Sequence, residues 1–240
     1  MARLLSSPLS LSSTSQGFSV VDSQELTQIA SALVLEHISS AVGGNFESLK
    51  TAAEFVIRER FDDFKDKQGR IFPSNLAETF LYSLVEFGYL DSNAGEFVTD
   101  EEDLGFPNIY WRLVRKNSPS DVGPIHADRW FWDLSNADFP RSHTRVKVWM
   151  PLYQDDLNPS LLILPGSQSQ EFNYSSRRDV AGKTRPVFED IAIARRMQPA
   201  PVRVGEAIVF HDSLLHGGRV TTENRVSVEF TMAKVPSSST

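Results

Sequence analysis

The strongest constraint on the fold is a run of alternating side chains near the end of the chain. From Arg225 to Val235 the sequence reads RVSVEFTMAKV, and large apolar residues fill every second position as far as Met232. Successive side chains of a β-strand point to opposite faces of its sheet. The run therefore predicts a strand with one apolar face and one face that carries Arg225 and Ser227.

Similar segments precede this run and predict a β-rich core. Starting near Ile109 they read YWRLVR, TRVKVWMPLY, SLLIL, PVRV and AIVF, and Pro, Gly, Asn and Ser residues separate them. No long helical pattern alternates with these strands, so we expect a mostly antiparallel, double-sheet jelly roll over residues 106–235. Residues 168–201 break the rhythm and predict an insertion that is partly helical near Ile191.

The first hundred residues show helical periodicity instead. The predicted helices cover roughly residues 22–43, 47–64 and 74–88. Asp22 with Glu25 resembles a capping box, and Gly43 supplies a stop signal. We therefore expect an α+β fold, in which a helical part at residues 22–100 supports the mainly β core.

Composition limits the organisation and the partners of the chain. Its 240 residues fit one domain, predicted at 22–240, after a Ser-rich flexible arm at 1–21. The net charge of -7 argues against nucleic-acid binding, and no apolar run approaches the ~20 residues that a membrane span needs. The opening lacks a convincing secretory segment, which predicts a cytoplasmic protein with a small-molecule partner and leaves the oligomeric state open.

Two short motifs supply candidate metal ligands. The chain has no cysteine, so a metal site must use His, Asp or Glu. His126 and Asp128 are separated by one residue, which places both side chains on one face of an extended segment. Alone, such a pair is more often a turn with a solvated Asp than a metal site.

A third candidate ligand raises the significance of the pair. His216 follows a predicted strand and precedes Gly217 and Gly218. Two His and one carboxylate leave coordination positions open, which suits non-haem Fe(II) that binds an oxo-acid and then O2. His211 is the competing candidate, but we expect it to pack nearby without binding metal, and we expect His37 and His143 to be structural.

Arg225 is the candidate anchor for an oxo-acid carboxylate. A guanidinium group grips a carboxylate with two parallel hydrogen bonds, and the hydroxyl of Ser227 on the same strand face can add a third. A surface arginine on an edge strand is the alternative interpretation of Arg225. If Arg225 does not bind the carboxylate, Arg112 or Arg115 is the expected replacement.

Taken together, these motifs resemble the phytanoyl-CoA dioxygenase-like family of Fe(II)- and 2-oxoglutarate-dependent oxygenases. The resemblance spans roughly residues 106–232 and rests on H-x-D, VWMPLYQDDLNPSLLILPGSQ, FHDSLLHGG and NRVSVEF. In that family a Trp-bearing strand precedes an N-G-x-L-x-x-x-P-G-S-H stretch. Here the strand holds Trp149, while Pro159 and Gln168 replace the Gly and the final His, which lie in a turn and are not metal ligands.

The resemblance implies a double-stranded β-helix and three small molecules: Fe(II), 2-oxoglutarate and O2. It implies that 2-oxoglutarate chelates the iron, that its distal carboxylate meets Arg225 and Ser227, and that Trp149 flanks it. A core aromatic is the alternative for Trp149. Hydroxylation of a small-molecule substrate is the default outcome, with ring formation, desaturation and epimerisation as alternatives.

Residues near the metal motif are candidates for the substrate pocket. They are Arg115, Arg129, Trp130 and Trp132, although core packing is an equal alternative for the two tryptophans. Three rival functions are weighed against the oxygenase. Asp128 argues against a halogenase, the lack of an obvious general-base Glu argues against a zinc hydrolase, and retention of Arg225 with all three ligands argues against a non-catalytic jelly-roll binding module.

Overall fold

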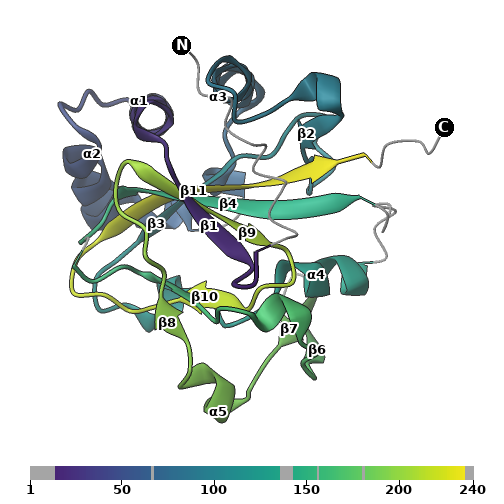
Figure 1. The fold of residues 1–240 in the computed structure, drawn as a ribbon. Coiled ribbons are helices and arrows are strands. Elements are labelled where there is room, and N and C mark those ends of the chain that lie inside the picture. The colour runs from purple at the N-terminus through teal and green to yellow at the C-terminus, as the bar shows by residue number, and fades with distance from the viewer. Residues whose placement is uncertain (1–13, 66–67, 136–142, 156, 180–181, 236–240) are drawn as a thin grey trace.

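A large antiparallel sheet forms one wall of the molecule (Figure 1). The computed structural model describes residues 14–65, 68–135, 143–155, 157–179 and 182–235. The sheet has the order β1 (Phe18–Asp22), β9 (Glu206–His211), β4 (Thr144–Tyr153), β11 (Arg225–Lys234) and β2 (Glu96–Val98), and β3 (Tyr110–Val114) also pairs with β11.

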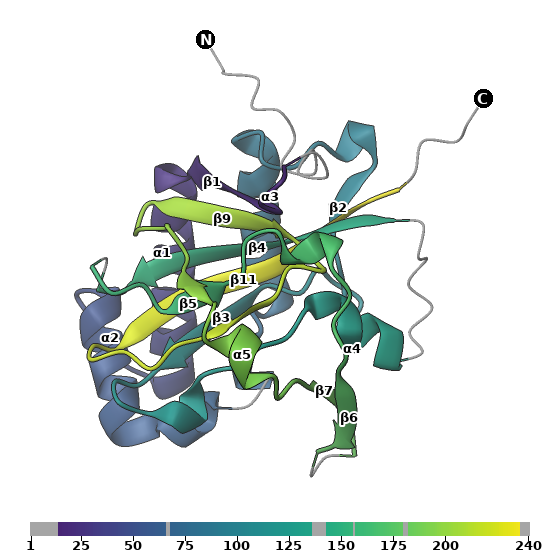
Figure 2. The same cartoon turned by 60° about the horizontal axis from the view of Figure 1, so that its bottom comes forward.

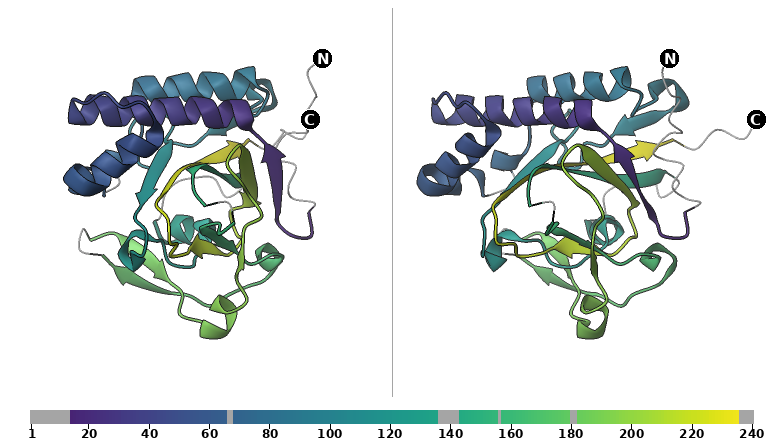
Figure 3. Two further views of the ribbon diagram at one scale, coloured as in Figure 1. Left: turned by 90° about the vertical axis from the view of Figure 1, so that its left-hand side faces the viewer. Right: turned by 60° about the vertical axis from the view of Figure 1, so that its left-hand side comes forward.

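A smaller sheet forms the opposite wall. It contains β10 (His216–Gly218), β5 (Leu161–Ile163) and β8 (Gln198–Pro199), all antiparallel. Seen along the strands, the two sheets close into a ring, with helices on the outside of the large sheet (Figure 3). The predicted double-stranded β-helix with a supporting helical layer is confirmed.

The predicted helices are present in the first hundred residues. They are α1 (Gln24–Val42), α2 (Leu49–Phe55), extended by a π-helical turn at Val56–Arg60 and a 3-10 turn at Phe61–Phe64, and α3 (Ser74–Glu86). Gly43 ends α1 with a φ of 66°, as its stop signal predicts. No helix among the residues described is long and apolar enough to cross a membrane.

The helices cover the large sheet because its strands alternate as predicted. The apolar side chains of β11 are fully or almost fully buried in a core shared with α1, α2 and α3; they are Val226, Val228, Phe230 and Met232. The ring of Phe80 from α3 meets that of Phe230 edge to face, with centroids 5.5 Å apart. The other face of β11 is thereby directed into the ring of strands.

A second apolar cluster fills part of the space between the two sheets. Trp149, Ile208 and Phe210 of the large sheet pack against Leu161 and Ile163 of the small one. This packing fixes the separation of the sheets, so that polar side chains near it are held in a walled interior.

The insertion at 168–201 folds into small elements of its own. A hairpin of β6 (Ser175–Arg178) and β7 (Thr184–Val187) lies beside α4 (Asp128–Ser135), and α5 (Ile191–Ala194) confirms the helix expected near Ile191 (Figure 2). Sequence analysis missed the hairpin because neither SSRR in β6, which is exposed, nor TRPV in β7 shows apolar alternation.

Three details of the sequence prediction are wrong. Residues 18–21 belong to β1, which pairs with β9, and not to a flexible arm; residues 1–13 lie outside the described part of the chain. The capping box at Asp22 does not form, since Ser23 is the N-cap of α1. The run PVRV is no strand; the residues that pair with β5 are Gln198–Pro199, just before it.

The contact between α3 and β11 predicts a large stability loss in Phe230→Ala. Removing this fully buried ring leaves a cavity and should cost about 3–5 kcal/mol of unfolding free energy. Urea titration gives the value. Phe87→Ala is the matched control, because Phe87 is 37% exposed and its removal should cost about 1 kcal/mol or less. Equal losses in the two variants would contradict the buried helix–sheet interface.

Candidate metal centre

Reciprocal backbone hydrogen bonds bring His126 and His216 together. The N–H of each residue donates to the C=O of the other at 2.9 Å, forming an isolated antiparallel bridge. Residues paired in this way project their side chains from the same face. The two imidazole centroids accordingly lie 4.3 Å apart.

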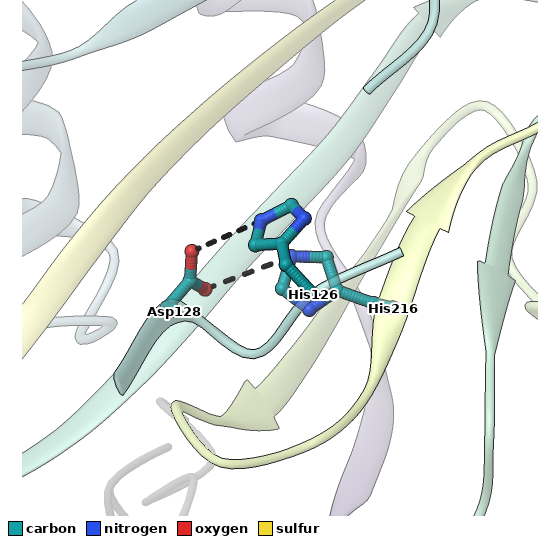
Figure 4. A group of neighbouring side chains, drawn as sticks. All are labelled: His126, Asp128 and His216. Carbon is teal, nitrogen blue, oxygen red and sulfur yellow. Dashed lines mark ion pairs between the residues drawn. The ribbon is translucent and has the colours of Figure 1, made fainter. Parts of the chain in front are cut away.

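The third predicted ligand enters from a helix. Asp128 is the first residue of α4, so the expected extended geometry ends at His126 and the first helical turn directs the carboxylate. Its two oxygens face the two rings, with Oδ1 3.6 Å from Nε2 of His126 and Oδ2 3.7 Å from Nε2 of His216 (Figure 4). One ligand atom from each residue lies within 4.8 Å of the others.

The hydrogen bonds of the two rings show which nitrogens face the carboxylate as acceptors. Nδ1 of His126 lies 2.8 Å from the C=O of Pro124, and Nδ1 of His216 lies 3.0 Å from that of Leu214. A carbonyl only accepts, so both Nδ1 atoms carry a proton, and a neutral ring in this tautomer presents its lone pair at Nε2. Both Nε2 atoms face Asp128, whose buried Oδ2 has no hydrogen-bond partner in the described structure.

Electrostatics keep these groups in the forms that bind metal. Burial and the neighbouring His126 lower the pKa of His216 to about 4, so its ring is neutral at pH 7. Burial works to raise the pKa of Asp128, but His216, Lys147 and His126 together hold it well below its usual range. A neutral imidazole and an ionised carboxylate are the required states of such ligands.

Two glycines allow the close approach of the ligand segments. A Cβ at Gly218 would lie 2.8 Å from Cβ of Val122, and one at Gly217 would lie 3.1 Å from Cα of Ile125. A side chain at either position would push the segment that precedes His126 away from β10. The HGG sequence therefore supports the backbone bridge at His126.

Asp212 and Arg145 connect the helix of Asp128 to the loop of His216. The backbone C=O of Asp212 accepts a 2.9 Å hydrogen bond from the N–H of Arg129, in the first turn of α4. Its carboxylate forms a buried 2.9 Å ion pair with Arg145, whose guanidinium lies 5.0 Å from the ring of Trp132 on the same helix. Sequence analysis missed both residues, although Asp212 stands inside the FHDSLLH motif.

The turn PGSQ has a structural role near His216. Ser167 is fully buried, and its hydroxyl accepts a 2.8 Å hydrogen bond from the N–H of Leu215, next to the ligand. Gly166 adopts a φ of 78°, a conformation that favours glycine. The turn thus fixes the backbone on the N-terminal side of His216.

The remaining histidines lie outside the three-residue cluster. The Nδ1 atom of His211 accepts a 3.1 Å hydrogen bond from the N–H of Ser213, within the loop that leads to His216. His37 packs among aromatic rings of the helical layer, and His143 lies 6.0 Å from the ring of Phe97. None of the three belongs to the group of His126, Asp128 and His216 among the described residues, and that none of them binds metal stays a prediction.

Arg225 and Ser227 face the interior, as the alternation predicts. Both are buried, at 3% and 0% exposure, and Nη1 of Arg225 donates a 2.7 Å hydrogen bond to Oγ of Ser160. Nε of Arg225 and Oγ of Ser227 are buried without a hydrogen-bond partner among the described residues. Trp149 flanks them, with its ring centroid 5.7 Å from the guanidinium carbon of Arg225.

The predicted substrate-pocket residues do not form one pocket. Arg129 is exposed beside Asp133, and Trp130 is buried against Tyr174 under the insertion. Arg115 follows the last residue of β3 and contacts Asp121 and Phe61, outside the ring of strands. Because α4 is a helix, its side chains spread around an axis, and of the three predicted residues on α4, Trp132 is the one whose ring lies near Arg145, at 5.0 Å from the guanidinium.

Three further residues near the site were not predicted as pocket residues. Phe131 stands edge-on to His126, with ring centroids 5.2 Å apart. Glu229 and Arg112 share the interior face with Ser227, since Ser227 is the partner of Arg112 and Glu229 that of Trp149. The alternation in RVSVEF that located Ser227 also places Glu229 on this face.

The fold and the cluster together define a class of protein. A jelly roll that holds two histidines and one carboxylate is typical of non-haem iron oxygenases. The family model described as phytanoyl-CoA dioxygenase (PhyH) matches residues 62–226. The chain belongs to the phytanoyl-CoA dioxygenase family of iron- and 2-oxoglutarate-dependent oxygenases.

Solved structures share the fold at low sequence identity. EctD from S. alaskensis, determined with 2-oxoglutarate and 5-hydroxyectoine, has a TM-score of 0.53 at 12% identity, over 96% of this chain and 78% of its own. EvdMO1 reaches 0.51 at 16% identity, over 92% and 48%. EvdO2 from Micromonospora carbonacea var. aurantiaca, complexed with 2-oxoglutarate, reaches 0.50 at 12%, over 93% and 88%. A comparison with curated proteins finds no match.

The geometry predicts which histidine of FHDSLLH binds metal. His126→Ala, Asp128→Ala or His216→Ala should each weaken Fe(II) binding by more than the roughly 10- to 100-fold that loss of an outer hydrogen-bond partner costs. Anaerobic calorimetric titration with Fe(II) measures the affinity. His211→Ala is the matched control and should keep one Fe(II) per chain. Loss of Fe(II) from His211→Ala with retention in His216→Ala would overturn the assignment.

Proposed function

We propose that this chain is an Fe(II)- and 2-oxoglutarate-dependent oxygenase that hydroxylates a small-molecule substrate. The observation that carries the proposal is the convergence of two imidazole Nε2 atoms on the two oxygens of one carboxylate, at 3.6 and 3.7 Å. Acceptors that face one another without a proton between them repel, and a cation among them removes the repulsion. His126, Asp128 and His216 are the proposed ligands.

The donor set fits iron better than a structural zinc. Two neutral imidazoles and one carboxylate leave positions open for a cosubstrate, whereas a closed zinc site uses four protein ligands. Among the described residues, the group of possible ligands contains these three side chains. Asp128 also disfavours a halogenase, which needs the place of the carboxylate for a halide.

The interior beside the ligands fits 2-oxoglutarate. Arg225 keeps its charge at pH 7, because burial and the nearby Arg112 lower its pKa only to about 9. Its Nε and the hydroxyl of Ser227 are two buried donors without partners in the described structure, and a carboxylate would satisfy both. EctD and EvdO2 have each been solved with 2-oxoglutarate, which supports the same cosubstrate for this chain.

The proposed roles of the chain are binding, orientation and exclusion of water. When bound, the iron and its cosubstrate supply the oxidation of a C–H bond. Arg225 and Ser227 hold the far carboxylate of the cosubstrate, and Trp149 walls it from the small sheet. Phe131 covers one side of His126, which limits the directions from which a substrate reaches the metal.

An absorption experiment tests the cosubstrate. Anaerobic protein with Fe(II) and 2-oxoglutarate should show the weak visible charge-transfer band of a chelated oxo-acid. Succinate release after addition of O2 gives an independent measure of turnover. Bound Fe(II) without the band and without succinate would remove the oxygenase and favour the non-catalytic binding module.

The role of Arg225 predicts a graded series of variants. Arg225→Lys keeps the charge but loses the planar fork, so the 2-oxoglutarate affinity should fall about 10- to 1000-fold, with Fe(II) binding retained. Arg225→Ala should be weaker still. Ser227→Ala removes one neutral hydrogen bond and should cost about 0.5–1.5 kcal/mol. Titration of the band with 2-oxoglutarate provides each affinity.

An unchanged affinity in Arg225→Ala would disprove this role. Arg112 would then be the replacement, because it faces the interior across from Ser227. Arg115 is excluded by its position outside the ring of strands, in contact with Asp121 and Phe61. Arg115→Ala is therefore a suitable control and should leave the 2-oxoglutarate titration unchanged.

A further inference from the structure

The inner face of the large sheet carries several charged side chains beside the proposed iron site. Glu229 on β11, Lys147 on β4 and Arg112 on β3 all lie on the face of the sheet opposite the helices. Glu101 joins them from the loop after β2, where it accepts a hydrogen bond from the hydroxyl of Thr231. An acyl-binding channel would instead be lined with apolar side chains.

The charged groups are paired loosely with one another. Nη2 of Arg112 lies 3.6 Å from Oε1 of Glu229, and Nζ of Lys147 lies 3.9 Å from Oε1 of Glu101. Both distances exceed that of a good charge-assisted hydrogen bond. The side chains of Arg112 and Glu229 retain 29% and 22% exposure, and those of Lys147 and Glu101 retain 9% and 19%, so none of the four is fully shielded.

The charges in this interior are balanced. Among the residues that the structure describes, three carboxylates, those of Asp128, Glu101 and Glu229, are matched here by three cations, Arg112, Lys147 and Arg225. The phenol of Tyr110 stays neutral, because burial and nearby carboxylates raise its pKa. Fe(II) and the 2-oxoglutarate dianion bring opposite charges of equal size, so their binding preserves the balance.

Three cations around this interior are paired as well. Arg145 pairs with Asp212 at 2.9 Å, and Arg185, whose guanidinium lies 6.0 Å from the ring of Phe131, pairs with Asp179 at 2.9 Å. Lys183 of the hairpin pairs with Glu102 at 3.2 Å. A phosphate, carboxylate or ammonium group of a substrate would have to break one of these pairs to obtain a partner.

We propose that the prime substrate is an uncharged compound that presents hydroxyl groups to Glu229, Lys147, Glu101 and Arg112. This inference rests on the proposed oxygenase function and names its substrate class. A charged substrate would leave one buried charge without a partner. An apolar substrate would remove water from the loosely paired groups without replacing its hydrogen bonds, whereas hydroxyls both donate to the carboxylates and accept from the cations.

Matched probes test the substrate class by binding. Methyl glucoside, inositol and uridine represent three uncharged ring frameworks, each compared with a carboxylate analogue and an amine analogue, and anisole is the apolar probe. Titration calorimetry on the anaerobic Fe(II)–2-oxoglutarate complex gives the affinities. In the framework that binds best, the uncharged member should bind at least about tenfold more tightly than both charged analogues, and more tightly than anisole.

Charge-changing variants test whether the balance sets this preference. Glu229→Gln leaves an excess positive charge and should move the ranking about tenfold or more towards the carboxylate analogue. Lys147→Gln leaves an excess negative charge and should move it towards the amine analogue. Glu229→Asp and Lys147→Arg keep the charges and should keep the wild-type ranking. Asp133→Asn, which changes the charge equally on the outer side of α4, should also leave it unchanged.

The outcomes separate the inference from the function on which it rests. Absence of the visible band overturns the oxygenase itself. If the band is present, tighter binding of a charged or apolar probe overturns the substrate class, as does the lack of binding by every uncharged probe. The role of the charge balance is overturned if Glu229→Gln and Lys147→Gln both keep the band and shift the ranking of probes in the same direction. It is also overturned if neither variant shifts the ranking.

Discussion

The reciprocal backbone hydrogen bonds between His126 and His216 hold the site together. They join a segment that leaves β3 to the short strand β10 of the opposite sheet, so the two ligand-bearing segments are aligned by main-chain geometry. Gly217 and Gly218 permit the close approach, and Ser167 fixes the residue before His216. Since the main chain sets the spacing of the two rings, a metal ion can find its ligands largely arranged before it binds.

Sequence patterns were sufficient for the parts of the molecule that depend on periodicity. Alternation along β11 located the helix-covered face and the interior positions of Arg225 and Ser227. Successive side chains of a strand point to opposite faces whatever partner the strand pairs with. The same rule gives no information on α4, a helix that begins inside the metal motif, so it could not tell that Arg129 and Trp130 point away from Trp132. Asp212 and Arg145 could not be paired from sequence, because their contact depends on how the loop after β9 meets β4.

The charged interior is costly to fold and informative about function. Burying ionised groups removes their hydration, and pairs at 3.6 and 3.9 Å recover only part of it. A chain that needed only stability would place apolar residues at Glu229 and Lys147, where the strands already sit between two apolar clusters. Retaining polar groups there gives a preorganised set of donors and acceptors that need little reorientation when a polar ligand arrives.

The pairing of β1 with β9 also bears on how the chain acquires its fold. Phe18 lies opposite Phe210, and the central strand β11 comes last in sequence, so most contacts of the large sheet join segments that are far apart along the chain. Such non-local topology slows folding. During synthesis, α1 and α3 emerge long before the strand that buries their apolar faces, which leaves those faces open to chaperones or to self-association until β11 has been made.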